Sequence, residues 1–103
     1  MDQMEVTFSA IDDAVNDIRA GKIVIVVDDE DRENEGDFVI AADRCTTETI
    51  NFMATHGRGI ICAALTSQRT GELMLEMMVD SNTSLHETPF TVSVDYIHGT
   101  RTG

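Results

Sequence analysis

Hydrophobic and polar positions repeat with a helical period over residues 9–20. The apolar positions have the i, i+3, i+4, i+7 spacing that places them on one helix face. They are Ile11, Ala14, Val15 and Ile18. Ser9 is the expected N-cap, with Asp12 three residues later in a short capping box, and Gly21 is expected to end the helix. The sequence therefore predicts an amphipathic helix over 9–20.

Four further segments have the pattern of β-strands. Residues 23–27 are all β-branched and do not alternate, which is typical of a strand buried on both faces. Residues 38–42 and 60–65 predict two more strands. Residues 90–95 alternate apolar with polar side chains, which predicts a half-buried strand with Phe90, Val92 and Val94 inside.

Two more helices are expected between these strands. One begins at Thr46 or Thr47, carries an apolar stripe and ends near Gly57 or Gly59. The stripe consists of Ile50, Met53 and Ala54. A short helix within 67–79, broken by Gly71, precedes a methionine-rich turn. The order helix, strand, strand, helix, strand, helix, strand indicates a mixed layered sheet with helices.

Charge and cysteine usage narrow the class of protein. The 103 residues include 19 acidic and 7 basic ones, for a net charge of −12. This argues against nucleic acid and anionic membrane surfaces as partners, and is compatible either with a divalent cation or with a merely solvated acidic surface. Cys45 and Cys62 form no zinc or disulfide framework, and no signal peptide or membrane-length apolar run is visible. We therefore expect a cytoplasmic protein.

An acidic run follows the first expected strand directly. Seven of the ten residues from Asp28 to Asp37 are acidic. A solvated loop is the simplest interpretation, but ligands often lie at the carboxyl ends of strands in α/β sheets. An EF-hand is excluded: counting from Asp29 puts Asn34 at the glycine position, and counting from Asp31 puts Ala42 where a glutamate is required.

The decapeptide Asp-Asp-Glu-Asp-Arg-Glu-Asn-Glu-Gly-Asp at 28–37 resembles the signature loop of the 3,4-dihydroxy-2-butanone 4-phosphate synthases. The resemblance continues in Gly-Arg-Gly-Ile-Ile-Cys at 57–62, in Met-Met at 77–78 with Asn-Thr-Ser at 82–84, and in Phe-Thr-Val-Ser-Val-Asp at 90–95. The final Thr-Gly matches the start of the next family motif. The resemblance covers nearly all of residues 1–103, which correspond to the N-terminal half of one such domain with no second domain visible.

The resemblance implies a fold and an activity. The fold would be α+β, a three-layer α/β/α-type arrangement with a mixed sheet, here incomplete, and the enzyme would be a homodimer. The reaction would be a lyase step of riboflavin biosynthesis, converting ribulose 5-phosphate to formate and 3,4-dihydroxy-2-butanone 4-phosphate. It would proceed through a Mg²⁺-stabilised (or Mn²⁺-stabilised) enediolate and a skeletal rearrangement.

The family's second metal ligand, a histidine in a Gly-His-Thr-Glu segment, has no counterpart in this sequence. We therefore expect the 103-residue chain alone to be inactive or weak. In many bacteria the family domain is fused to a GTP cyclohydrolase II domain, and the sequence leaves open whether that holds here.

The resemblance also assigns roles to residues. Glu33 matches the family's metal-ligating glutamate and contacts substrate, and Arg32 and Asp37 match other positions that contact substrate. Asp28 and Glu35 match acids implicated in proton transfer.

Cys62 matches a thiol that lines the site, although it equally fits a small apolar core position. Our hypothesis makes Asp28 the base and either Glu35 or Cys62 its partner. The alternative function is a non-catalytic acidic module that binds divalent cations or a basic partner through residues 28–37.

Overall fold

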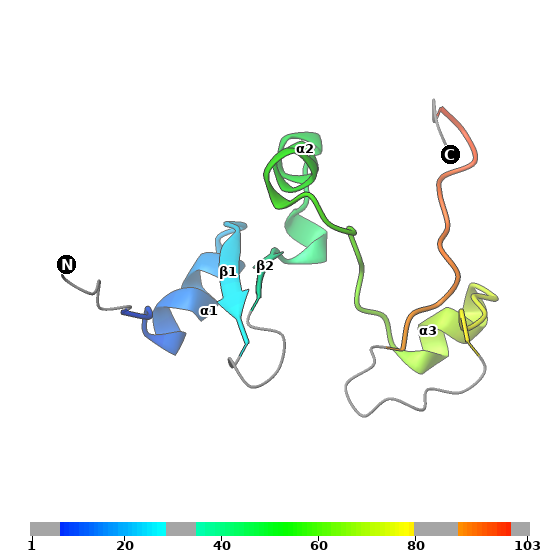
Figure 1. Cartoon of the computed structure of the whole chain (residues 1–103), viewed down its shortest axis with the longest axis horizontal. Helices are drawn as coiled ribbons and strands as arrows, with labels where there is room; N and C mark the ends of the chain where they lie inside the picture. The colour runs from blue at the N-terminus through cyan, green and yellow to red at the C-terminus, as the bar shows by residue number, and fades with distance from the viewer. Residues whose placement is uncertain (1–6, 29–34, 80–88, 100–103) are drawn as a thin grey trace. The chain divides into compact units, whose positions relative to one another are not determined.

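The computed structural model describes residues 7–28, 35–79 and 89–99. It divides into two compact units, Met1–Ala63 and Ala64–Gly103, each considered by itself below. The first unit holds four main elements and a 3₁₀ turn, and the second holds one helix (Figure 1). In chain order these are α1 (Ile11–Arg19), β1 (Val24–Val27), β2 (Gly36–Val39), η1 (Ala42–Arg44), α2 (Thr47–Gly57) and α3 (Ser67–Glu72).

Helix α1 confirms the expected helix and its end, but its start differs from the prediction. Gly21 has φ +79°, and the Lys22 N–H donates to the Asp17 carbonyl at 2.9 Å, which closes the last turn. The N-cap residue is Ala10, whose side chain has no oxygen to offer, so the predicted Ser9 cap and its capping box are wrong. The Ala10 carbonyl instead accepts the Ala14 N–H at 3.2 Å, one residue further along than expected.

Strands β1 and β2 form an antiparallel hairpin. The register places Val24 opposite Val39, and Ile25 opposite Phe38. Because strand side chains alternate between faces, Ile25 and Phe38 share one face of the hairpin, while Val24, Val26, Asp37 and Val39 share the other. The second strand begins at Gly36, two residues before the expected range of 38–42, and ends at Val39. The last residue of the expected range belongs to η1.

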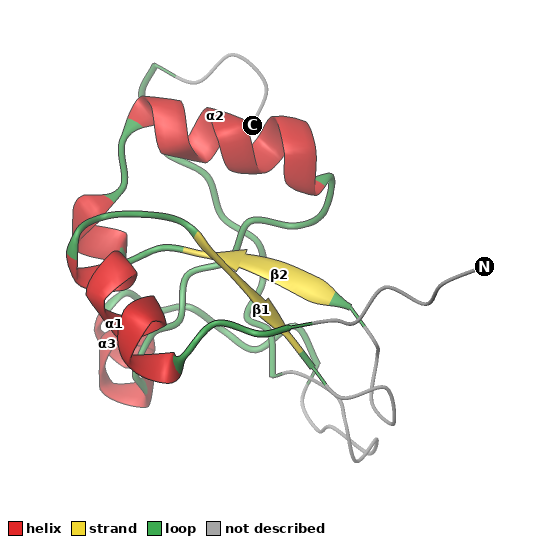
Figure 2. Cartoon of the chain, turned by 90° about the vertical axis from the view of Figure 1, so that its left-hand side faces the viewer, coloured by secondary structure: helices red, strands yellow, loops and turns green. Residues whose placement is uncertain are grey.

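Helix α2 begins at the expected place and packs on the hairpin through β2 (Figure 2). Thr46 accepts the Thr49 N–H at 3.1 Å, and the Thr49 hydroxyl accepts the Thr46 N–H at 2.8 Å, which makes a reciprocal capping box. The ring of Phe52 lies 5.5 Å from that of Phe38 and 4.5 Å from that of His56. These rings join α2 to the Ile25 and Phe38 face of the hairpin. No helix among the described residues is long and apolar enough to cross a membrane.

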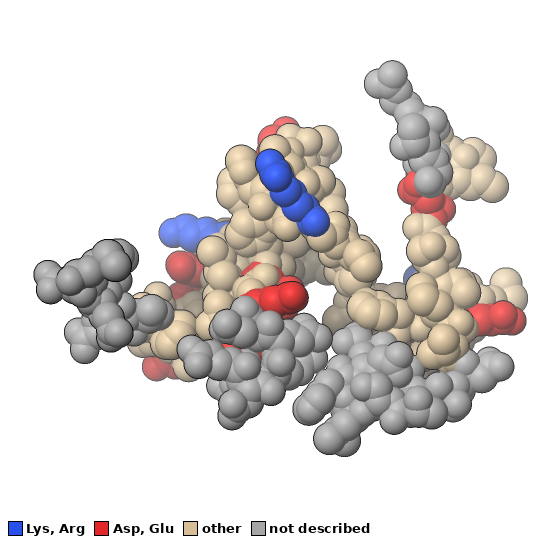
Figure 3. Space-filling model, viewed as in Figure 1, with Lys and Arg blue, Asp and Glu red and all other residues tan. Residues whose placement is uncertain are grey.

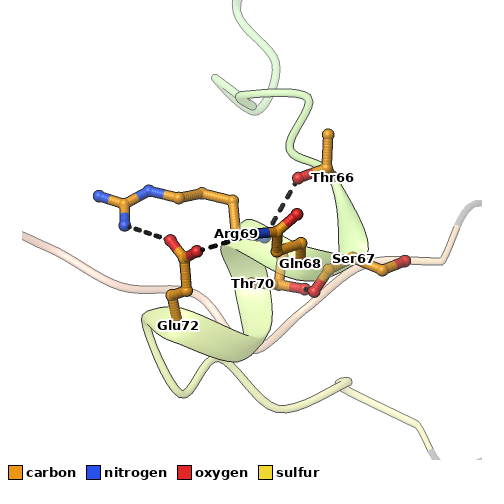
Figure 4. A network of polar contacts seen from close by, with 6 residues as sticks. All are labelled: Thr66, Ser67, Gln68, Arg69, Thr70 and Glu72. Carbon is orange, nitrogen blue, oxygen red and sulfur yellow. Dashed lines mark hydrogen bonds and ion pairs between the residues drawn. The ribbon is translucent and has the colours of Figure 1, made fainter.

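Helix α3 in the second unit is held by side-chain contacts within a single turn (Figure 4). Thr66 accepts the Arg69 N–H at 3.1 Å, and the Arg69 guanidinium donates to Glu72 at 2.9 Å. The helix ends after Glu72, and Met74 adopts φ +56°. The helix expected within 67–79 is thus short, but it runs through Gly71 and does not break there as predicted.

The predicted strands at 60–65 and 90–95 are not strands in this structure. Residues 60–66 form no regular element. The Met78 N–H donates to Phe90 O at 2.9 Å and the Val92 N–H to Glu76 O at 2.8 Å, but only one bridge, between Met77 and Thr91, results. The expected alternation in burial is also absent: Phe90, Val92 and Val94 are 43%, 42% and 68% exposed, whereas Thr91 is half-buried.

The sheet of the described residues therefore has two strands, and neither face of β1 is closed. Ile25 remains 67% exposed, which contradicts the prediction of a strand buried on both faces. No described residue is buried. The apolar run was a correct indication of a strand, but its burial requires further chain that packs on it. The described elements are those of an α+β protein.

The Thr46 capping box generates a stability prediction. Thr46→Ala removes the acceptor for the Thr49 N–H, and losing an N-cap costs about 1 kcal/mol. Urea unfolding followed by circular dichroism at the helix band should show that loss. Thr46→Ser should retain most of the stability because the hydroxyl remains. Thr47→Ala, at the adjacent exposed position, is the matched control and should change the free energy of unfolding by less than ~0.5 kcal/mol. Equal losses in the two alanine variants would contradict the capping role.

Candidate functional site

Two acidic residues lie at the loop end of the hairpin. Asp28 directly follows β1, and Glu35 directly precedes β2. The Asp28 N–H donates to the Glu35 carbonyl at 3.2 Å, and the Glu35 N–H donates to Oδ1 of Asp28 at 2.9 Å. The pair continues the register of β1 and β2 by one step, with the Asp28 carboxylate accepting the N–H that its own carbonyl would normally accept. The bond therefore fixes the orientation of an acidic side chain at the end of the apolar strand.

Asp37 lies two residues further on, within β2. It is paired with Val26 and exposed. It shares a face with Val24 and Val39, opposite the face that Phe38 presents to α2. Figure 3 shows acidic side chains at this end of the hairpin. Three of the six predicted site residues (Asp28, Glu35 and Asp37) thus come from the ends of two paired strands.

Of the other three predicted site residues, two lie outside the described residues and one lies in an irregular segment. Arg32 and Glu33 lie outside the described residues, in the segment 29–34 whose sequence neighbours are Asp28 and Glu35. Cys62 lies in the irregular segment 60–66, exposed and not in a disulfide. Its exposure means that it fills no core position in this structure. Its place in the site remains a prediction.

The donor set suits a hard cation. Magnesium prefers carboxylate oxygens and commonly takes only one or two of them from the protein. Asp28 and Glu35 hold such groups on either side of the segment that contains Glu33. Within residues 7–28, 35–79 and 89–99, no group of three or more His, Cys, Asp or Glu side chains could hold a metal ion. The described carboxylates alone therefore form no metal site, and the expected ligand Glu33 lies outside the described residues.

A shallow groove on the Phe38 face of the hairpin was not foreseen from the sequence. Its lining combines apolar side chains with one cation and one anion. The lining residues are Lys22, Ile23, Ile25, Phe38, Glu48, Thr49 and Phe52. The one signal in the sequence was the i, i+4 spacing of Glu48 and Phe52 on α2, but only the packing of α2 on β2 brings them opposite Ile25.

The fold and the acidic hairpin end define an α+β protein with a carboxylate-rich candidate site. A family model described as 3,4-dihydroxy-2-butanone 4-phosphate synthase matches residues 12–103. Because the match takes in most of the sequence, the chain belongs to the 3,4-dihydroxy-2-butanone 4-phosphate synthase family.

Individual relatives agree with this membership. The chain is 55% identical over 100 residues to riboflavin biosynthesis protein RibBA of Porphyromonas gingivalis, covering 96% of this chain and 25% of that protein. It is 54% identical over 97 residues to 3,4-dihydroxy-2-butanone 4-phosphate synthase of Photobacterium phosphoreum, covering 94% and 27%. A crystal structure of 3,4-dihydroxy-2-butanone 4-phosphate synthase in complex with two magnesium ions matches with a TM-score of 0.83 at 47% identity, covering 93% of this chain and 45% of that one. The chain thus spans about a quarter of the length of the curated relatives and less than half of the solved one.

The Asp28–Glu35 closure predicts a specific change in hydrogen exchange. Asp28→Ala removes the acceptor for the Glu35 N–H, so the Glu35 amide should exchange about five- to tenfold faster, corresponding to ~1–1.4 kcal/mol for one hydrogen bond. Asp28→Asn retains an oxygen acceptor and should show a smaller change. Amide exchange measured by NMR would reveal the difference. An unchanged Glu35 rate in Asp28→Ala would rule out the closure in solution.

Proposed function

We propose that this chain supplies the acidic-loop part of a lyase that converts D-ribulose 5-phosphate to formate and L-3,4-dihydroxy-2-butanone 4-phosphate in riboflavin biosynthesis. The observation that carries the proposal is the family match over residues 12–103, which includes the whole acidic run. The Asp28–Glu35 closure supports it, because it fixes two of the matched acids at the end of the hairpin. The relatives' names point to the same pathway.

Asp28 is the proposed base. The first step of the reaction removes a proton from the carbon next to the substrate's carbonyl, and an oriented carboxylate can accept it. The Glu35 N–H fixes the rotamer of Asp28 through Oδ1. A carboxylate has about four lone-pair sites, so one N–H bond does not prevent it from taking a proton. Geometry at this position therefore suits a base.

Glu35 or Cys62 is the proposed proton-transfer partner of Asp28. Glu35 is exposed and is the residue whose N–H bonds Asp28, which puts its backbone beside the base. Cys62 is an exposed thiol in the same unit of the chain. Expulsion of water from the substrate requires a donated proton, and either group has one to donate in its neutral form. The two candidates differ in chemistry, so conservative substitution separates them.

Arg32, Glu33 and Asp37 are the proposed substrate contacts. A guanidinium suits the anionic phosphate or the sugar hydroxyls, and carboxylates accept hydrogen bonds from hydroxyl groups. Asp37 is exposed on β2, two residues from Glu35, where a hydroxylated ligand can reach it. These three residues would orient the sugar phosphate relative to Asp28.

Mg²⁺ (or Mn²⁺) is the proposed cofactor, with Glu33 as its ligand. When bound, such an ion stabilises negative charge that develops on the substrate's oxygen atoms. The solved relative was crystallised with two magnesium ions. The carboxylates that flank Glu33 in sequence, Asp28 and Glu35, keep the local potential negative and so favour a cation.

The finer features of the fold and setting are proposals as well. We infer a three-layer arrangement with a mixed sheet, because β1 carries apolar side chains on both faces. We also infer a cytoplasmic homodimer, and the net charge of −12 supports the inference that it binds neither nucleic acid nor membrane.

Activity is tested on the protein expressed from its full-length gene. With ¹³C-labelled ribulose 5-phosphate and Mg²⁺, NMR should show labelled formate. Asp28→Asn should lower kcat by about 10²- to 10⁴-fold, the usual contribution of a general base. Asp43→Asn, an exposed acid in η1 of the same unit, is the matched control and should retain kcat. Near-native turnover in Asp28→Asn would show that Asp28 is not the base. Absence of formate with the folded, unsubstituted protein would overturn the lyase proposal.

Metal binding is tested separately from turnover. Glu33→Gln should weaken Mn²⁺ binding by at least about tenfold in water-proton relaxation measurements, because the variant loses a charged oxygen ligand. Calorimetric titration of the parent with Mg²⁺ should show tighter binding when ribulose 5-phosphate is present. Metal binding that ignores the sugar phosphate would favour the alternative, a cation-binding module without catalysis.

A further inference from the structure

The three described acids of the candidate site lie on one face of the hairpin. Asp28 is opposite Glu35, and two residues further along each strand Val26 is opposite Asp37. Side chains two residues apart in a strand point to the same side, so these two pairs project from the same face. We call the loop end of this face the acid face, and it consists of Val26, Asp28, Glu35 and Asp37.

The opposite face of the two strands has no acid among its described residues. It presents Ile25, Val27, Gly36 and Phe38. The contacts around Gly36 agree with this placement, because a Cβ there would lie 3.4 Å from Cγ2 of Ile25 and 3.4 Å from Cγ1 of Val27. Helix α2 packs against this face through the rings of Phe52 and Phe38. The hairpin therefore separates an apolar face that contacts α2 from the acid face.

Val26 is the apolar member of the acid face. It lies directly across from Asp37 and two residues before Asp28. The Cα atoms of these two acids are therefore about 5.5 and 7 Å from that of Val26. Val26 is 51% exposed, so its methyl groups can contact a ligand. A molecule that contacts Asp28 and Asp37 together lies between the side chains of Val26 and Glu35.

The proposed substrate has groups that suit both kinds of side chain on this face. Hydroxyl groups of ribulose 5-phosphate can donate hydrogen bonds to the carboxylates. Its carbon–hydrogen groups form no such bonds, and their contact with an apolar side chain is favoured because it displaces water. Val26 is the side chain on the acid face that can make this contact.

We propose that ribulose 5-phosphate binds on the acid face and that Val26 contacts its carbon chain. The inference rests on the proposed lyase function. It adds the face of the hairpin from which the substrate approaches Asp28. It also adds a specificity-determining residue that lies outside the acidic decapeptide 28–37.

Substitution of Val26 should change KM and not kcat. An apolar contact with the carbon chain is made equally in the ground state and the transition state, so its loss weakens both to the same extent. Val26→Ala removes two methyl groups and should raise KM for ribulose 5-phosphate by about five- to tenfold. Val26→Leu should raise KM at least about threefold, because the longer side chain enters the space of the substrate. In both variants kcat, measured by NMR of labelled formate, should stay within about threefold.

Val27 is the matched control because it is the same residue type on the opposite face. It is adjacent to Val26 in β1 and similarly exposed, at 47%. Val27→Ala and Val27→Leu should each keep KM within about twofold. All four variants are made in the protein expressed from its full-length gene and assayed with Mg²⁺. Thermal unfolding shows whether each is folded at the assay temperature, and Mn²⁺ binding should be unchanged in the Val26 variants because valine is no metal ligand.

The outcomes separate this inference from the lyase function. A raised KM with retained kcat in the Val26 variants alone supports the proposal. The proposal is overturned, while the lyase function stands, if the unsubstituted protein releases formate and the Val26 variants keep its KM. It is also overturned if the Val27 variants raise KM equally, or if neither Val26 variant folds, since Val26 would then serve the fold. Absence of formate with the unsubstituted protein contradicts the lyase function and this inference together.

Discussion

The hydrogen bond from the Glu35 N–H to the Asp28 carboxylate is the contact on which the candidate site depends. It lies where the apolar strand β1 meets the acidic run, two segments with opposing tendencies. The residues of β1 favour an extended, water-excluded strand, whereas the acidic residues that follow repel one another and favour solvent. By using a side-chain acceptor at the last step of the ladder, the hairpin ends on an acid. The same bond that ends the sheet thereby orients a candidate base.

The position of α2 follows from the hairpin register. Because Phe38 and Ile25 are opposite each other, one face of the hairpin presents a ring and a branched chain together. Phe52 of α2 packs against that ring, and Gly57 leaves room for it: a Cβ at Gly57 would lie 3.3 Å from Phe38. A shift of one residue in register would turn Phe38 to the other face and release α2. The acidic pair and the helix contact thus depend on one alignment.

Local signals predicted the parts of the fold that are decided locally. The helix end at Gly21 and the reciprocal cap of α2 at Thr46 both arise from contacts within a few residues. The N-cap of α1 was missed because the helix begins one residue later than the Ser9 pattern indicates. Segment 60–65 has a strand-like pattern but no ladder partner among the described residues, and segment 90–95 has only the single bridge between Thr91 and Met77. A strand is defined by its neighbour, so its pattern alone could not predict that outcome.

The candidate site, like the fold, was predictable from the sequence only in part. The acidic run and its place after an apolar strand were visible in the sequence, but the pairing of Asp28 with Glu35 across seven residues required the hairpin. The groove beside Phe38 required the packing of α2 and was not foreseen. The prediction that β1 is buried on both faces fails for this chain, yet its composition explains the failure. A strand that is β-branched at every position is suited to the middle of a sheet, and here it has one neighbour. The exposed apolar side chains on both faces of β1 therefore show that the hairpin lacks packing partners.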